Sequence, residues 1–292
     1  MTLQQIAFLG TGLMGAPMVR RLLGAGYSVR VWNRDSAKAQ ALVADGAERA
    51  DTPAQAVAGA GVVFTMLSDG AAVDDVLFAR GTAGHLAAGA VVVDTSSIAP
   101  DQARAHAAQL AAQGTPHVDC PVSGGVAGAE AGTLALMAGG AADVIAQLAP
   151  VLAPLGRVTH VGPSGAGQVC KLANQQIVAI TIAAVAEAMV LVEAGGADRA
   201  KFRQAIRGGF AESRILDLHG GRMVTRDFTP GGPARLHLKD LNTVAALAQA
   251  QGLTLPQTEA VRQAFSDFVA NGGGEDDHSA LLVHLERMNP AT

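Results

Sequence analysis

The chain has 292 residues and a formal net charge of −4, and 49% of its residues are hydrophobic while only 3% are aromatic. A chain of this length forms one large or two medium domains and buries roughly 75% of its unfolded surface. The negative charge and the lack of a basic patch exclude nucleic acid as a partner. Because the chain shows no secretory pattern and only two cysteines, Cys120 and Cys170, we expect a cytoplasmic protein without disulfides. No histidine or cysteine spacing matches a metal motif, so we expect no metal.

The first half of the chain alternates strand and helix patterns. Its nearly all-apolar runs are typical of parallel strands that are covered on both faces. We therefore expect an α/β Rossmann domain over residues 1–164, with a mostly parallel, doubly wound sheet and a few extra strands. The predicted strands cover residues 6–9, 28–32, 61–67, 90–94, 117–120, 134–138 and 158–161, and the predicted helices cover 16–23, 37–45, 52–58, 73–78, 101–113 and 142–152.

From Gln168 onward the strand patterns stop. Residues 165–292 predict an all-α domain, which begins with a long helix over 168–194 that would be roughly 40 Å long at ~1.5 Å per residue. The length of this helix permits a membrane span, but polar residues such as Lys171 and Glu187 interrupt it and no aromatic belt flanks it. We interpret it as a buried helix that joins two domains, and we expect no contact with a membrane.

A dinucleotide-binding pattern follows the first predicted strand. Gly10, Gly12 and Gly15 have the G-x-G-x-x-G spacing, and a helix and a second strand come after them. The first glycine permits a tight turn, the second lets the backbone approach a pyrophosphate, and the third lets the helix pack on the strand. The N-terminus of that helix then faces the phosphates.

The end of the second predicted strand indicates which dinucleotide binds. The usual acidic residue that accepts from a ribose hydroxyl is replaced by Asn33, and Arg34 follows it. A neutral amide does not repel a 2′-phosphate, and a guanidinium can pair with one. The sequence therefore favours NADP(H), with NAD(H) as the alternative. The opposing interpretation is that Arg34 is a solvated loop residue and that Asp35 caps the next helix.

A serine and two glycines end another predicted strand. Successive backbone N–H groups of Ser123, Gly124 and Gly125, together with the serine hydroxyl, can form an anion-binding loop. A substrate carboxylate would fit there. An ordinary glycine turn explains the same pattern equally well.

Polar residues also form a stripe at the start of the long helix. Gln168, Lys171, Asn174 and Gln175 fall on one face of an otherwise apolar segment. Burial would lower the pKa of Lys171 toward neutrality, which suits general acid–base catalysis. The alternative is that the first turns of this helix simply face solvent.

Taken together, four ordered segments resemble the β-hydroxyacid dehydrogenase family over nearly the whole chain. The segments are Gly10–Gly15, Asp119–Gly125 followed by Gly132–Leu134, Gly165–Asn174 and Lys239–Leu241. The resemblance implies a Rossmann domain, a long interdomain helix and an all-α domain. It also implies an NAD(P)-dependent oxidoreductase that acts on CH–OH or aldehyde groups and forms homodimers or homotetramers.

The resemblance also implies a role for each matching residue. Lys171 would be the catalytic acid–base, and Ser123 to Gly125 would bind the substrate carboxylate. Asn174 and Gln175 would hold the other polar groups of the substrate. The residues assigned to the cofactor are Gly10, Thr11, Gly12, Leu13, Met14, Gly15, Asn33, Arg34, Leu67, Ser68, Thr95, Ser96 and Lys239.

One departure indicates a branch of the family. Many members, including 3-hydroxyisobutyrate dehydrogenases, have two asparagines after the lysine, whereas this chain has Asn174 and Gln175. The run from Lys171 to Gln175 and three further segments look more like tartronate semialdehyde reductases. The three segments are residues 205–209, 236–240 and 277–281. The implied reaction is reduction by NADPH of a short carboxylate-bearing semialdehyde, first of all tartronate semialdehyde to glycerate, with Lys171 as general acid.

Other activities remain open alternatives. They are 3-hydroxyisobutyrate dehydrogenase, glyoxylate or succinic semialdehyde reductase, and imine reductase on the same scaffold. A non-catalytic NADP-binding sensor is the alternative from a different class. The joint presence of Ser123, Lys171, Asn174 and Lys239 speaks against a sensor.

Overall fold

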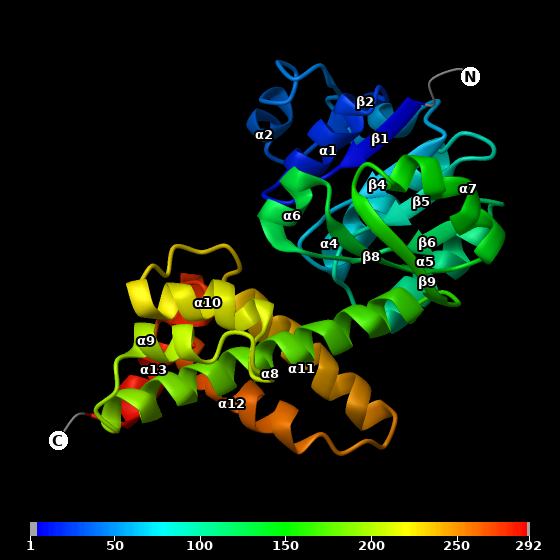
Figure 1. Cartoon of the computed structure of the whole chain (residues 1–292). Helices are drawn as coiled ribbons and strands as arrows, with labels where there is room; N and C mark the ends of the chain where they lie inside the picture. Colours follow the sequence, from blue (N-terminus) through cyan, green and yellow to red (C-terminus); the bar gives the residue numbers. More distant parts are fainter. Residues whose placement is uncertain (1–4, 291–292) are drawn as a thin grey trace. The chain divides into compact units, whose positions relative to one another are not determined.

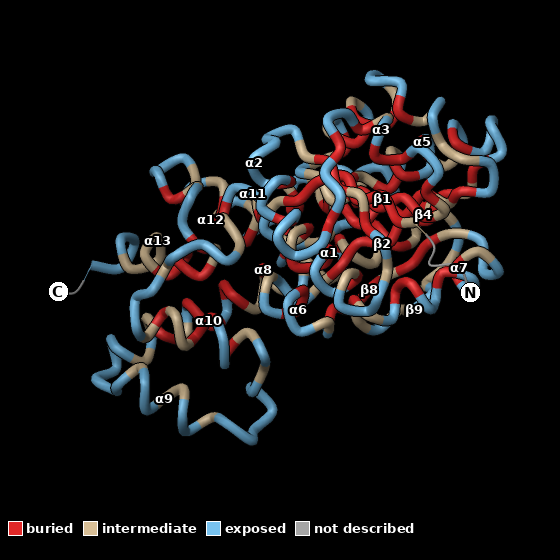
Figure 2. Tube along the Cα trace, turned by 90° about the horizontal axis from the view of Figure 1, so that it is seen from above, coloured by how far each residue is buried: buried red, intermediate tan, exposed pale blue. Residues whose placement is uncertain are grey.

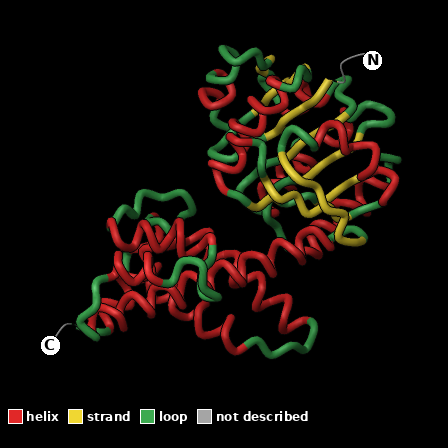
Figure 3. Tube along the Cα trace, in the orientation of Figure 1, coloured by secondary structure: helices red, strands yellow, loops and turns green. Residues whose placement is uncertain are grey.

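The computed structural model describes residues 5–290, and the chain divides into two compact units, residues 1–171 and 172–292. Figure 1 traces the chain by colour, and Figure 3 shows that the strands belong to the first unit while the second consists of helices and loops. The α/β sheet followed by a helical unit confirms the fold class expected from the sequence.

The first unit is built on one sheet with the strand order β3-β2-β1-β4-β5-β6-β8-β7, and β9 pairs with β8. Strands β1 to β6 pair in parallel, β8 runs antiparallel to β6 and β7, and β9 is parallel to β8. The sheet is therefore mostly parallel with a few extra strands, as predicted. The strands are β1 (Gln5–Leu9), β2 (Ser28–Trp32), β3 (Glu48–Arg49), β4 (Val62–Thr65), β5 (Val91–Asp94), β6 (His117–Asp119), β7 (Val122–Ser123), β8 (Leu134–Gly139) and β9 (Gly156–Gly162).

Both faces of this sheet are buried at its central strands, such as β1 and β4. Side chains alternate along a strand, so in β1 Ile6 and Phe8 enter one core cluster while Ala7 and Leu9 enter another. Phe8 stacks on Phe64 of β4 with ring centroids 5.5 Å apart. The burial colours of Figure 2 show β1 and β4 as buried, which explains why their sequences are continuous apolar runs.

The helices of the first unit cover this sheet. They are α1 (Gly15–Gly24), α2 (Ser36–Gln40), α3 (Pro53–Val57), α4 (Gly70–Asp74), α5 (Pro100–Ala111), α6 (Gly125–Ala131) and α7 (Ala142–Leu152), with a π-helical turn at Asp75–Ala79 and a 3-10 turn at Thr82–His85. The predicted helix over 37–45 was too long, since α2 ends at Gln40 and turns follow. The predicted helix over 73–78 is instead the end of α4 and the π-helical turn.

Several boundaries differ from the predictions for local reasons. The predicted strand over 61–67 is shorter because the N–H of Leu67 donates to Ser96 Oγ and so leaves the sheet ladder. The strands β3 and β7 span two residues each, too short for a periodic pattern, and were not predicted. The helix α6 was also missed because its glycine-rich sequence has weak helix propensity.

The second unit consists of helices packed around their own core. The long helix α8 (Ala166–Ala194) starts two residues earlier than predicted and leads from one unit into the other. The core includes Ile182, Met189, Leu216 and Phe265. The remaining α-helices are α9 (Arg199–Ala205), α10 (Arg214–Thr225), α11 (Ala234–Ala250), α12 (Pro256–Ala270) and α13 (Leu281–Met288).

Among the described helices, only α8 is long and apolar enough to cross a membrane by length and composition. A third of its most apolar window, 33%, is buried inside the structure. Large apolar side chains such as Ile177 and Leu191 are exposed on it.

Candidate active site

The glycine loop between β1 and α1 has the shape that a dinucleotide phosphate requires. Gly10 has a φ of +104°, and a Cβ at this residue would collide with the carbonyl oxygen of Met66. A Cβ on Gly15 would collide with the carbonyl oxygen of Gly10, so this glycine lets α1 pack against the loop. A Cβ on Gly12 would meet nothing within 4 Å. The loop is thus tightly packed at its two outer glycines and open at the middle one, which fits a pyrophosphate.

The residue in the usual acidic position is tied to this loop. Asn33 Oδ1 accepts a hydrogen bond from the N–H of Thr11 at 2.9 Å, and Asn33 Nδ2 donates to the carbonyl of Asp35 at 3.0 Å. Asp35 caps α2 by accepting from the N–H of Ala37. Asn33 therefore links the glycine loop to the end of β2 without adding a negative charge.

A pocket of about 390 Å³ opens beside this link and is lined by the guanidinium-bearing side chains of Arg34, Arg49 and Arg80. Arg49 pairs with Asp51 at 2.7 Å, while Arg34 is exposed. The guanidinium of Arg80 lies 5.9 Å from the ring centroid of Trp32, which also lines the pocket. Guanidinium groups and an aromatic ring suit a phosphorylated adenosine.

Two buried carboxylates shape the neighbouring ends of strands. Asp94 ends β5, and its Oδ1 accepts from Thr65 Oγ1 at 2.7 Å and from the N–H of Ser96 at 2.9 Å. Burial raises the pKa of Asp94 above its usual value. The hydroxyl of Thr95 donates to the carbonyl of Thr65 at 2.6 Å. The hydroxyls predicted to meet the cofactor at Thr95 and Ser96 thus hold the ends of β4 and β5 together.

The other carboxylate anchors the start of α8. Asp119 ends β6, and its two oxygens accept from the N–H groups of Gly165 at 2.7 Å and Gln168 at 3.0 Å. Burial raises the pKa of Asp119 to about 6, against these hydrogen bonds, which lower it. Gln168 is fully buried; its Oε1 accepts from the N–H of Ile98 and its Nε2 donates to the carbonyl of Ser96. Lys171, half-buried, follows one helical turn later.

The predicted carboxylate loop lies at the end of β7. Ser123 is half-buried, and the exposed Gly124 and Gly125 both have positive φ, +141° and +64°. Side chains larger than hydrogen adopt such φ values rarely, which explains the pair of glycines. Gly124 is the N-cap of α6 and Gly125 is its first residue, so this turn joins a strand end to a helix start.

In the second unit, α8 and α11 meet at the other predicted site residues. Gln175 Nε2 donates to Asp240 Oδ2 at 2.7 Å, and Asn174 Nδ2 donates to Gln175 Oε1 at 3.0 Å. Lys239 Nζ lies 3.3 Å from Asp240 Oδ1. The lysine and both amides therefore belong to one network of polar side chains.

The sequence interpretation missed several residues that organise these groups. By sequence, Asp94 lies at the end of a predicted strand, Asp119 at the start of a segment that resembles the family, and Gln168 in a polar stripe, without a role assigned to any of them. Asp240 was taken with Lys239 without a role of its own. A charged residue that ends an apolar strand is the signal that could have identified the two strand-end carboxylates, since an unpaired charge is rarely buried.

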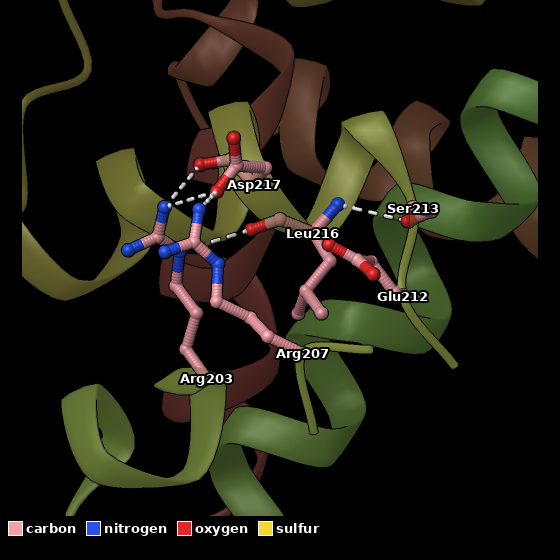
Figure 4. Close-up of a pocket in the computed structure, with 6 residues that line it drawn as sticks. All are labelled: Arg203, Arg207, Glu212, Ser213, Leu216 and Asp217. Atoms are coloured by element: carbon pink, nitrogen blue, oxygen red, sulfur yellow. Dashed lines mark hydrogen bonds and ion pairs between the residues drawn. The ribbon is translucent and has the colours of Figure 1, made fainter. Parts of the chain in front are cut away.

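A further pocket lies between α9 and α10 (Figure 4) and contains none of the predicted site residues. Asp217 Oδ1 lies 2.8 Å from Arg203 Nη2 and 2.7 Å from Arg207 Nη2. Ser213 caps α10 by accepting from the N–H of Leu216. These charges pair with one another and join the two helices.

Both parts of the chain match known families. Residues 5–162 match the NAD binding domain of 6-phosphogluconate dehydrogenase, and residues 165–285 match the NAD-binding domain of NADP-dependent 3-hydroxyisobutyrate dehydrogenase. The 2-hydroxy-3-oxopropionate reductase of Escherichia coli K12 is 42% identical over 97% of this chain and 98% of its own. The chain belongs to the β-hydroxyacid dehydrogenase family.

Two solved structures agree with the fold. The Mycobacterium tuberculosis 3-hydroxyisobutyrate dehydrogenase with L-serine superimposes with a TM-score of 0.89 at 32% identity, over 97% of this chain and 99% of that one. Psf3 in complex with NADP+ and 2-OPP has a TM-score of 0.88 at 29% identity, over 96% and 99%. The protein is thus an NAD(P)-dependent oxidoreductase that acts on CH–OH or aldehyde groups.

Proposed function

We propose that this dehydrogenase reduces a short carboxylate-bearing semialdehyde to a hydroxy acid with NADPH, and that tartronate semialdehyde, which gives glycerate, is its substrate. The observation that carries the proposal is the identity of 42% over 97% of the chain to a 2-hydroxy-3-oxopropionate reductase. The amide pair Asn174 and Gln175 after Lys171, rather than two asparagines, supports the same branch.

The proposed chemistry divides among three groups of residues. The hydroxyl of Ser123 and the backbone N–H groups of Gly124 and Gly125 bind the substrate carboxylate. Lys171 Nζ donates a proton to the carbonyl oxygen as that oxygen gains negative charge. Asn174 and Gln175 bind the remaining polar groups of the substrate. NADPH supplies the hydride when bound.

We propose that Asp119 and Gln168 keep the lysine in place. Their hydrogen bonds fix the N–H groups at the start of α8 and tie that start to the loop after β5. The lysine one turn later then has a fixed backbone. A general acid depends on such positioning because small displacements reduce proton transfer strongly.

The preference for NADPH rests on the pocket at the end of β2. Asn33 brings no charge, and Arg34, Arg49 and Arg80 bring guanidinium groups to one pocket. We assign Arg34 to the 2′-phosphate and the loop Gly10 to Gly15 to the pyrophosphate. The remaining cofactor contacts that we propose are Leu67, Ser68, Thr95, Ser96 and Lys239.

A panel of substrates tests the proposal directly. Purified protein is assayed with NADPH and with NADH against tartronate semialdehyde, methylmalonate semialdehyde, succinic semialdehyde and glyoxylate. We expect kcat/KM to be highest for tartronate semialdehyde with NADPH. A higher value for methylmalonate semialdehyde would assign the enzyme to 3-hydroxyisobutyrate dehydrogenation, the activity named for the Mycobacterium tuberculosis structure.

We further propose that the enzyme is a cytoplasmic homodimer or homotetramer. The exposed apolar side chains Ile177 and Leu191 of α8 support this, since pairing of two copies along α8 would remove both from water. Light scattering coupled to gel filtration measures the mass in solution. A monomer at every concentration would contradict this part of the proposal.

A further inference from the structure

Three histidines from separate segments of the second unit form a continuous chain of ring contacts. His237 Nε2 lies 3.1 Å from the carbonyl oxygen of Gln175, and His237 Nδ1 lies 2.8 Å from His278 Nδ1. His278 Nε2 lies 3.3 Å from His219 Nε2. His219 Nδ1 lies 3.7 Å from Asp277 Oδ1. The chain thus runs from a helix carbonyl to a buried carboxylate.

The ends of this chain determine how many protons it needs. The carbonyl of Gln175 and the carboxylate of Asp277 both accept hydrogen bonds, and each neutral imidazole has one N–H and one acceptor nitrogen. Three neutral rings therefore supply three hydrogens for the four contacts. The longest contact, 3.7 Å, leaves the buried Nδ1 of His219 without a hydrogen-bond partner and facing a carboxylate oxygen. One added proton would satisfy every contact.

The surroundings favour that proton at the Asp277 end. Burial alone would raise the pKa of Asp277, but the adjacent His219, the nearby His278 and the hydrogen bonds from Ser279 hold it below its usual range. Burial, together with the neighbouring His237 and His219, lowers the pKa of His278 to about 3. The middle ring therefore stays neutral, and a positive charge is best placed on His219, beside the carboxylate.

Charged groups on the other elements around the chain are already paired. Arg222 Nη1 of α10 lies 2.7 Å from Asp277 Oδ2. On α11, Lys239 pairs with Asp240. Phe265 of α12 stacks on His237 with ring centroids 5.2 Å apart and adds no charge. The positive charge of Arg222 would repel a second added proton, so the histidine chain holds one added proton at most.

We propose that one added proton is shared by His219, His278 and His237. The proton allows His219 to donate a hydrogen bond to Asp277, and the three histidines then act as positioning residues for Gln175. The backbone carbonyl of Gln175 is held by His237, and its side chain is held by Asp240 on the same helix α11. The link to catalysis rests on the proposed function, in which Gln175 binds substrate. The proton itself does not depend on that function.

A metal ion is the competing occupant of this cluster, since ligand atoms of His219, Asp277 and His278 lie within 4.8 Å of one another. The carboxylate is poorly suited to it. Its oxygens already accept from the N–H and hydroxyl of Ser279, from the N–H groups of Gly231 and Gly232, and from Arg222. These five donors include the Arg222 cation and leave the carboxylate little negative charge to bind a divalent metal, whereas a single charged His219 N–H needs only the contact to Oδ1. A proton is therefore the better occupant.

Nitrogen-15 NMR of histidine-labelled full-length protein distinguishes these cases, because it reports which ring nitrogens carry hydrogen. At about pH 7, where histidine charge is set by its surroundings, we expect one imidazolium assigned to His219. His219→Gln should remove that signal and keep the structure, because one amide nitrogen can donate to both His278 and Asp277. His85→Gln, at the exposed His85, should leave the signal unchanged. Three neutral rings from about pH 6 to about pH 8 would overturn the proposal. So would stoichiometric binding of added Zn²⁺ at these rings.

Steady-state kinetics test the positioning role separately. As the pH rises and the proton leaves, KM for the semialdehyde should increase about fivefold, the effect of one hydrogen bond, while kcat changes less. His219→Gln should flatten this profile of KM against pH. A flat profile in the unmodified enzyme would refute the link to Gln175. Absence of turnover with every semialdehyde would refute the proposed function instead, and the NMR result would stand.

Discussion

Asp119 in the first unit and Asp277 in the second are both buried carboxylates that accept backbone N–H groups, yet their surroundings differ. Burial raises the pKa of Asp119 to about 6, against the hydrogen bonds from Gly165 and Gln168, which lower it. Asp277 pairs with Arg222, and His219, His278 and Ser279 hold its pKa below the usual range despite burial. The same residue type thus holds a proton readily in one unit and stays ionised in the other.

The difference follows from how each unit brings polar groups together. In the first unit the carboxyl ends of parallel strands lie along one edge of the sheet, so Asp94 and Asp119 lie on the same edge as the glycine loop through sheet topology alone. In the second unit the three histidines, Asp277 and Gln175 come from α8, α10, α11 and the turn before α13. Helix packing, rather than a strand register, sets which side chains meet there.

The largest expected effect tests whether the helix start anchored by Asp119 carries the proton donor. Lys171→Ala should lower kcat by about 10²- to 10⁴-fold, the contribution of a general acid. NADPH affinity, measured by fluorescence titration, should stay nearly unchanged. Lys201→Ala, at an exposed lysine of α9, is the matched control. Unchanged turnover would remove Lys171 from the mechanism.

Asp277→Asn tests the charge-paired side of the comparison. Removing one member of a buried ion pair costs about 3–5 kcal/mol, because Arg222 is left without its carboxylate. Since the folded pKa of Asp277 is depressed, its stabilisation is present above the unfolded pKa of 3.8 and is lost as the pH falls. The deficit in unfolding free energy should therefore widen as the pH rises through about 4. Asp267→Asn, at an exposed carboxylate of α12, should show no such deficit.

Asp119→Asn should show the opposite slope with pH. The folded pKa of Asp119 is raised from 3.8 to about 6, so the neutral carboxyl contributes stability that is fully present below pH 3.8. This stability is lost as the pH rises through about 6 and the group ionises. The shift corresponds to about 3 kcal/mol. Relative to the unmodified protein, the variant should gain about that amount between about pH 4 and about pH 6.

Urea unfolding across this range of pH measures the gain. Asp143→Asn, at an exposed carboxylate of α7, is the control and should leave the pH profile unchanged. If Asp119→Asn and Asp277→Asn show the same slope with pH, the contrast between the two carboxylates is wrong.

The smallest expected effect concerns the cofactor pocket at the end of β2. Arg34→Ala should weaken NADPH binding by at least about tenfold, the loss of one charge-assisted hydrogen bond, and should hardly change NADH binding. Arg20→Ala, an exposed arginine of α1, is the control. An equal loss for both cofactors would show that Arg34 does not contact the 2′-phosphate, and Arg49 and Arg80 would be examined next.

Much of the first unit could be predicted because its information is local. The glycine spacing, the apolar strands and the change at Asn33 and Arg34 are properties of short segments, and the sheet places their ends together. The short elements β3, β7 and α6 were missed because two to seven residues carry too little periodicity to recognise.

By itself, therefore, the sequence determined the fold class, the dinucleotide loop, the polar stripe around Lys171 and the family. Only the tertiary structure decided that Asp119 and Gln168 anchor the start of α8 and that His219, His237 and His278 join Asp277 to Gln175. The physical reason is distance along the chain. Strand and helix periodicity reports neighbours within one element, whereas hydrogen bonds between residues 40 or more positions apart depend on packing that no local pattern encodes.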